Sequence, residues 1–205
     1  MQTITKKSTS EFRSKGSKFI GYFLPVKNND EVTSALESVQ SEHPTATHHC
    51  YAYRLNPHKI EEFSQDDGEP GGTAGLPILN ELKSADIINA ILIVVRYYGG
   101  TKLGKPGLID AYGETARVCI AKASLKKLIP VNLYKIEYAY QHQGIIDQLK
   151  NEITWFEKEA TYMEHVSMTC GFPTIEIDLI ENKLRSKEHL FINLEEMGHS
   201  FHIVT

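Results

Sequence analysis

The chain has 205 residues, 41% of them hydrophobic and 23% charged, which is ordinary for a globular protein of one large domain or two small ones. Its net charge of −4 argues against a generic nucleic-acid binder, which would be clearly basic. No apolar run reaches transmembrane length and the N-terminus lacks the apolar core of a signal peptide, so we expect a cytoplasmic protein without a membrane partner.

The three cysteines, Cys50, Cys119 and Cys170, are far apart and odd in number. Their spacing matches neither a metal site nor a disulfide framework. We therefore expect each to be a reduced, buried, small hydrophobic residue, as is usual in the cytoplasm.

The charge is divided unevenly along the chain. Residues 134–205 hold 6 lysines and arginines against 12 acidic residues, whereas residues 1–133 hold 16 against 14. Because composition also shifts around Pro130, we predict a domain boundary near 128–134. The predicted domains are residues 1–130 and 131–205, with different partners.

The N-terminal part begins with a polar stretch, residues 2–16, for which no element is predicted. Residues 17–26 alternate as a strand does, and residues 30–42 have the spacing of an amphipathic helix with Asn29 as its N-cap. Residues 47–55 are a second strand, on which His48 and Cys50 point away from His49. We therefore favour structural histidines over metal ligands. Residues 60–64 are a short third strand.

An acidic, glycine-rich segment follows at residues 64–77, before a short helix that begins at Pro77. One interpretation is that its carboxylates hold a divalent cation. From the residue types alone, we favour a second interpretation, a solvated acidic turn with Asp67-Gly68 as its corner. The candidate residues of this segment are Asp66, Asp67, Gly68, Glu69, Gly72 and Thr73.

The stretch from Ile87 to Gly107 predicts a buried strand, a glycine loop and a helix whose first turn holds Pro106. A glycine loop that leads into a helix N-terminus presents free N–H groups, and lysines beside it favour an anion. The alternative is a plain turn that needs glycine for positive φ. The candidate anion or RNA site consists of Arg96, Tyr97, Gly99, Gly100, Thr101, Lys102, Gly104 and Lys105.

Residues 99–106 come close to the phosphate loop of nucleotide hydrolases but do not match it. That motif needs Ser or Thr after its lysine, to hold Mg²⁺ and to donate a backbone N–H. Pro106 supplies neither group, so we do not expect nucleotide hydrolysis here.

The C-terminal part predicts a ferredoxin-like order, βαββαβ. Residues 186–199 have no clear assignment. The expected elements are strands at 133–140, 153–158 and 163–170, helices at 144–152 and from Pro173, and a last strand at 200–204.

Three blocks of the first part resemble the IMPACT/YigZ family: THHCYAYR at 47–54, FSQDDGEPGGTAGLPIL at 63–79 and VVRYYGGTKLGKPGLIDAY at 94–112. The resemblance spans about residues 15–125, and the second part is similar to the small C-terminal domain of bacterial YigZ-type members. It implies an α+β protein whose first domain is like domain 2 of ribosomal protein S-five and domain IV of elongation factor G. The second domain would be like domain V of that factor. Eukaryotic relatives restrain activation of a kinase that phosphorylates an initiation factor, whereas bacterial members have no settled role.

The sequence departs from the family pattern at four places. Gly71 replaces a common serine, Leu76 replaces Lys or Arg, and Asp110 replaces an arginine. Lys105-Pro106 replaces two small residues. Two lost basic positions and one gained weaken the expected phosphate-binding face, although Asp110 in a first helical turn is locally stabilising.

Three functions remain open. The first is a translation-linked binding protein in which Arg96, Lys102 and Lys105 contact phosphates of RNA or the ribosome and Tyr97 or Tyr98 stacks on bases. The second is an adaptor for a translation-associated protein, using the acidic second domain. The third is a metal-assisted hydrolase using the acidic segment and a histidine from 48–49. No nucleophile–base pair is readable, and we expect no cofactor, no bound metal and no DNA sequence specificity.

Overall fold

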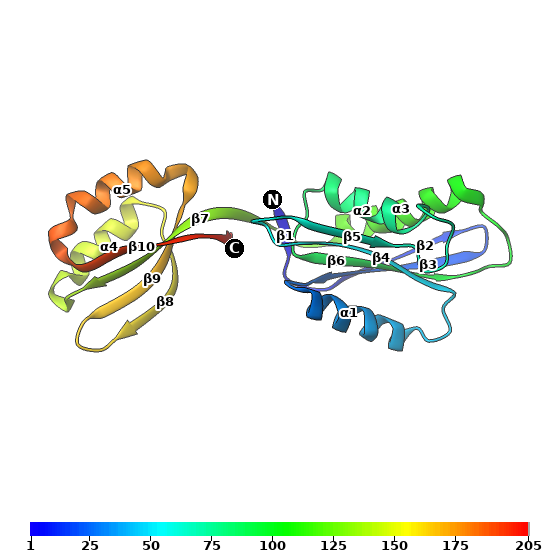
Figure 1. Cartoon of the computed structure of the whole chain (residues 1–205), viewed down its shortest axis with the longest axis horizontal. Coiled ribbons are helices and arrows are strands. Elements are labelled where there is room, and N and C mark those ends of the chain that lie inside the picture. Colours follow the sequence, from blue (N-terminus) through cyan, green and yellow to red (C-terminus); the bar gives the residue numbers. More distant parts are fainter. Residues whose placement is uncertain (205) are drawn as a thin grey trace. The chain divides into compact units, whose positions relative to one another are not determined.

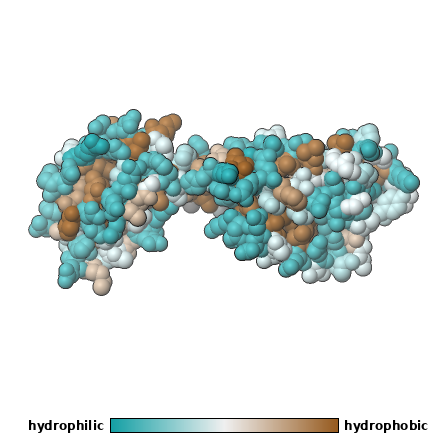
Figure 2. Space-filling model, viewed as in Figure 1, coloured by the Kyte–Doolittle hydropathy of each residue, from teal (hydrophilic) through white to brown (hydrophobic). Residues whose placement is uncertain are grey.

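The structure is a computed structural model that describes residues 1–204, and the chain forms two compact units that divide between Lys127 and Leu128 (Figure 1). Hydrophilic side chains cover most of the visible surface of each unit, with small hydrophobic patches between them (Figure 2). Among the described residues, no helix is long and apolar enough to cross a membrane.

The first unit is built on a five-stranded antiparallel sheet in the order β2-β3-β6-β4-β5. The central strand, β6, is buried on both faces, as the run of apolar residues predicts. The strands are β2 (Ser8–Ser14), β3 (Ser17–Pro25), β4 (His48–Leu55), β5 (Glu61–Gln65) and β6 (Ala90–Tyr97).

Helices cover both faces of this sheet (Figure 1). Helices α2 (Gly75–Ser84) and α3 (Gly104–Lys122) pack on one face, against the β6 residues Leu92 and Val94. Helix α1 (Asn29–Glu42) packs on the other face, where Ile91, Ile93 and Val95 lie.

The N-cap of α1 is Asn28, so the prediction of Asn29 was wrong by one residue. The Asn28 side chain accepts a hydrogen bond from the Glu31 N–H at 2.9 Å, and the Glu31 carboxylate accepts one from the Lys27 N–H at 2.8 Å. Two adjacent asparagines made the sequence signal ambiguous, and the bond from the Glu31 N–H identifies Asn28 as the cap.

Two strands lie in the N-terminal segment for which none was predicted, β1 (Gln2–Ile4) and β2. Strand β2 is an edge strand with Ser10 as its one buried residue, so its sequence carries almost no apolar alternation. A tight turn with positive φ at Lys15 and Gly16 joins β2 to β3.

The second unit has the predicted βαββαβ order, with antiparallel strands in the order β8-β9-β7-β10. Its core lies between this sheet and two helices, with Ile146 and Leu149 from one helix and Ile180 and Leu184 from the other. The elements are β7 (Leu125–Tyr138), α4 (Gln143–Glu152), β8 (Phe156–Tyr162), β9 (Val166–Pro173), α5 (Ile177–Ser186) and β10 (Phe191–Ile203), with 3₁₀ turns at Tyr140–His142, Thr174–Glu176 and Glu188–Leu190.

Strand β10 fills most of the unassigned residues 186–199. Register shifts between Phe191 and Asn193 and between Glu196 and Gly198 interrupt its side-chain alternation, which hides the strand in the sequence. Strand β7 begins in the first unit, where Leu125 to Lys127 pair with β1, and continues past Leu128 into the second. The division between the units therefore falls inside a strand.

Candidate functional site

The loop between β6 and α3 depends on glycine at two positions for different reasons. A Cβ atom at Gly99 would lie 2.0 Å from the backbone carbon of Gly16, so the loop packs directly against the β2–β3 turn. Gly100 has open space around it but a φ of +84°, which other residues rarely adopt. The start of the loop is thus held close to the sheet.

Arg96, near the end of β6, is buried, with a residue exposure of 5%. Its Nη1 donates to Glu69 Oε1 at 2.5 Å, and its Nη2 donates to Ser17 Oγ at 3.3 Å. Its buried Nε has no hydrogen-bond partner among the described residues. The expected phosphate contact of Arg96 does not fit this position, because Arg96 is buried and already pairs with a carboxylate.

Glu69 is the partner that the acidic segment supplies, and its side chain is 4% exposed. Its Oε1 also accepts a hydrogen bond from the Tyr112 hydroxyl at 2.8 Å, and His48 Nε2 lies 3.8 Å away. Burial, followed by the neighbouring Cys50 and Glu69, raises the pKa of Tyr112. The neutral Tyr112 therefore remains a donor that stabilises the Glu69 carboxylate.

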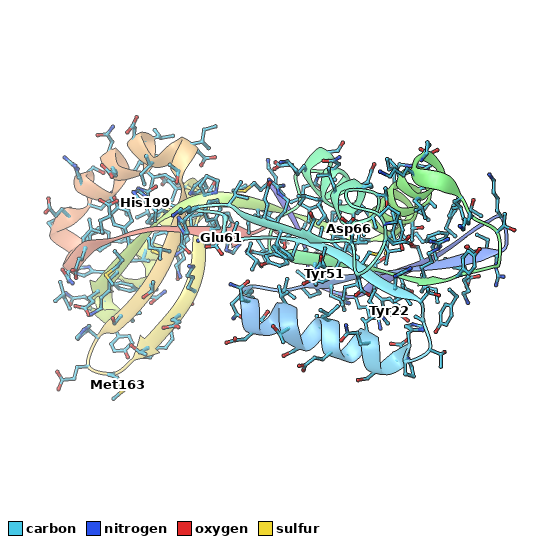
Figure 3. All side chains as sticks on the ribbon, turned by 45° about the vertical axis from the view of Figure 1, so that its right-hand side comes forward. Tyr22, Tyr51, Glu61, Asp66, Met163 and His199 are labelled. Atoms are coloured by element: carbon cyan, nitrogen blue, oxygen red, sulfur yellow. The ribbon has the colours of Figure 1, made fainter. Side chains whose placement is uncertain are left out.

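The Asp66 carboxylate accepts hydrogen bonds from the backbone at the start of α2, on the side of the sheet that α2 and α3 cover (Figure 3). Its Oδ1 accepts from the N–H groups of Ala74 at 3.0 Å and Gly75 at 2.9 Å, and its Oδ2 accepts from the Gly72 N–H at 2.8 Å. A carboxylate at a helix N-terminus is stabilised by these donors and by the helix dipole. Thr73 Oγ1 donates to the Pro70 carbonyl at 2.6 Å and closes the turn.

The interpretation of a solvated acidic turn was therefore wrong for Asp66 and Glu69. It was right about the corner, since Asp67 and Gly68 both have positive φ and Asp67 is exposed. Asp67 Oδ2 accepts from the His49 N–H at 2.6 Å. The carboxylates point to separate partners, and no group of three metal-ligating side chains occurs among residues 1–204.

The His48-His49-Cys50 run is held by the same segment. His48 Nδ1 lies 2.7 Å from the Asp67 carbonyl, and the Cys50 thiol donates to the Asp66 carbonyl at 2.9 Å. Burial lowers the pKa of His49 and raises the pKa of the Cys50 thiol. A thiol with a raised pKa is a poor nucleophile, and His48, His49 and Cys50 are each held by a contact with the acidic segment.

A pocket of about 370 Å³ lies where the acidic segment meets the glycine loop. Lys102 and Lys105 are exposed at this pocket and form no ion pair with any residue that the structure describes. The N–H groups of Thr101 and Lys102 likewise donate to no acceptor within that part of the chain. The lining residues are Glu69, Pro70, Arg96, Tyr98, Lys102, Leu103, Gly104, Lys105 and Leu108.

Tyr97 does not reach the pocket. Its hydroxyl lies 2.9 Å from His43 Nδ1, on the α1 face of the sheet. Tyr98 lines the pocket instead, 46% exposed, with the Arg96 Cζ 5.5 Å from its ring centroid. Side-chain alternation along the strand could have separated the two tyrosines, because it places Arg96 and Tyr98 on one side and Tyr97 on the other.

Two further residues, Ser17 and Tyr112, contribute hydrogen bonds to the site and were not predicted from the sequence. Ser17 Oγ accepts from the Gly99 N–H at 3.2 Å as well as from Arg96, and Tyr112 is a buried residue of α3. Their roles depend on long-range pairing, for which a single sequence holds no signal.

Two of the departures from the family pattern, Leu76 and Asp110, lie outside the pocket. A Cβ added at Gly71 would have no atom within 4 Å, so a serine would fit there.

These features define a two-unit α+β protein with a small charged pocket beside a glycine loop. The family model for the Impact N-terminal domain matches residues 15–120. The chain is 30% identical over 172 residues to the IMPACT family member YigZ of Escherichia coli, covering 83% of this chain and 84% of that protein. It is 30% identical to the family member YvyE of Bacillus subtilis, covering 80% and 76%. The chain belongs to the IMPACT family.

A crystal structure of a protein described as hypothetical matches with a TM-score of 0.64 and 27% sequence identity, covering 96% of each chain. This match spans both units of the chain. The expected likeness of the two units to domains of ribosomal protein S-five and elongation factor G stays a prediction.

Proposed function

We propose that this chain is a translation-linked binding protein that engages RNA through the glycine loop after β6. Membership in the IMPACT family supports the link to translation, because control of translation is the role that the family resemblance implies. The three free, buried cysteines fit a cytoplasmic setting for such a role. Fold and family alone say little about the ligand, so the choice of RNA depends on the pocket.

The observation that carries the proposal is the pair of unneutralised lysines at the start of α3. Lys102 and Lys105 line one pocket with the first turn of this 19-residue helix. Among residues 1–204, no side chain caps the N-terminus of α3. Mobile cations beside free N–H groups and the positive end of a helix dipole favour a phosphate group.

The acidic segment does not cancel this charge. Glu69 forms an ion pair with Arg96 at 2.5 Å, and the Asp66 carboxylate, which does not line the pocket, is stabilised by three backbone N–H groups. Asp67 is turned toward His49. Glu69 is the acidic residue that lines the pocket, and its pairing with Arg96 leaves the two lysines as the dominant charges there.

The test is a double substitution, Lys102→Ala with Lys105→Ala, measured by fluorescence anisotropy with single-stranded RNA over a range of salt concentrations. Each lost phosphate contact lowers the log–log salt slope by about one unit, so we expect weaker binding to every sequence and a slope lower by about one to two. Thermal stability should change little, because both side chains are exposed without ion pairs.

The matched control is Lys27→Ala with Lys59→Ala. Both residues are exposed lysines at the opposite end of the sheet, where β3 ends and β4 leads into β5. The control should bind RNA as the parent does. If the Lys102 and Lys105 variant keeps the parent's affinity and salt slope, the loop is only a turn, and an adaptor role for a translation-associated protein becomes the better account.

A further inference from the structure

We propose that the pocket beside the loop accepts a single unpaired nucleotide, with its base against Tyr98 and its phosphate at Lys102 and Lys105. This inference rests on the proposed function and narrows it from RNA in general to single-stranded RNA. It follows from the two kinds of surface that the pocket combines.

One wall of the pocket is apolar. Pro70, Leu103 and Leu108 line it together with the Tyr98 ring. A volume of about 370 Å³ is near the lower end of the range for small-molecule sites, so it suits one base and not a run of stacked bases. Binding of phosphate alone would not require an apolar surface.

Tyr98 is placed to stack. It is 46% exposed, and its backbone N–H donates to Thr47 Oγ1 at 3.1 Å, which fixes the residue at the end of the sheet. The Arg96 guanidinium lies 5.5 Å from the ring centroid. Aromatic side chains beside cations are the usual platform on which proteins stack unpaired bases, and stacking tolerates any base.

The buried ion pair leaves one buried hydrogen-bond donor, Arg96 Nε, unused. Arg96 is 95% buried and lines the pocket, yet its Nε has no acceptor among residues 1–204. Buried polar atoms usually have partners, so an unused donor on a residue that lines the pocket points to a ligand or to a water that bridges to one.

The lysines lie at the pocket's edge, on the first turn of α3 and just before it. A nucleotide whose base enters the pocket would bring its phosphate to these lysines and away from Glu69. A base in a duplex would first have to leave its stack, which costs a few kcal/mol. The pocket therefore selects unpaired RNA, whereas the lysines alone would accept either form.

The experiment compares Tyr98→Ala with Tyr140→Ala in the full-length protein. Tyr140 is a tyrosine of the second unit with a matching exposure of 47%. The probes are a fluorescent single-stranded RNA of about ten nucleotides, longer than one pocket requires, and its duplex. We expect Tyr98→Ala to weaken single-strand binding about tenfold or more, the factor that corresponds to the loss of one stacked base. The salt slope should stay unchanged, because no phosphate contact is lost.

Tyr98→Trp should restore binding to at least the parent level, because it keeps an aromatic ring. Tyr140→Ala should have no effect, and the parent should prefer the single strand to the duplex. If Tyr98→Ala binds like the parent while the Lys102 and Lys105 variant is weakened, the nucleotide pocket is wrong and loop binding stands. If the parent binds neither RNA, both proposals fail.

Discussion

Glu69 and Arg96 determine the charge that the acidic segment presents to the pocket. The pair is buried, and Glu69 Oε1 accepts from both Arg96 and Tyr112. A buried charge that loses its partner is strongly destabilising, because its desolvation is no longer compensated. The pair joins β6, α3 and the acidic segment, so its loss would affect three parts of the first unit.

We expect Glu69→Ala to lower the free energy of unfolding by roughly 3–5 kcal/mol, because it leaves the Arg96 guanidinium buried and unpaired. The measurement is urea unfolding followed by circular dichroism. Glu37→Ala is the control, since Glu37 is exposed on α1 and forms no ion pair within the described chain. A Glu69→Ala protein as stable as the Glu37→Ala protein would show that the pair contributes nothing to the fold.

Residue types in the sequence predicted several residues that line the candidate pocket but not their contacts. The glycine loop, Lys102 and Lys105 could be predicted because a strand, a glycine loop and a helix N-terminus are local features. The burial of Glu69 could not, because it depends on Arg96, which is 27 residues away in sequence. The same reason explains why an acidic turn was interpreted as solvated.

The loop between β6 and α3 is an element whose shape depends on one close backbone contact. A methyl group at Gly99 would lie 2.0 Å from the Gly16 backbone carbon and 2.4 Å from the Ser17 nitrogen. Backbone atoms cannot move aside as the end of a flexible side chain can. Either the loop or the β2–β3 turn would therefore have to shift.

We expect Gly99→Ala to destabilise the protein by about 2 kcal/mol or more, at the upper part of the range for overpacking. Gly71→Ala is the matched control, because its Cβ would have no atom within 4 Å and its φ is not in the left-handed region. Thermal unfolding of the two variants makes the comparison. Equal melting temperatures would mean that the contact between the two turns is not rigid.

Strong periodic elements could be predicted from the sequence, whereas strand β2 and the first part of strand β10 could not. Helix α1 and strand β6 have clear apolar periodicity, and both were predicted within a residue or two. Strands β2 and β10 lie at sheet edges, where one side chain in two does not need to be apolar. In β10 the bulges remove the remaining alternation.

At the scale of the whole molecule, the two units differ in their balance of acidic and basic residues. Residues 134–205 carry twice as many acidic as basic residues, and the two unpaired lysines of the pocket lie in the first unit. An anionic ligand should therefore meet the first unit and avoid the second. This division of roles agrees with the composition shift that predicts two domains, although independent folding of the two units stays a prediction.

The central claim is that RNA is bound at the pocket beside the glycine loop. It is tested most directly by ultraviolet crosslinking of the full-length protein to single-stranded RNA, followed by mass spectrometry of the attached peptides. We predict crosslinks within the peptide that contains Tyr98 and Lys102, lost in the Tyr98→Ala variant and kept in Tyr140→Ala. Crosslinks confined to residues 128–204, or none at all where binding is measured, would contradict the claim.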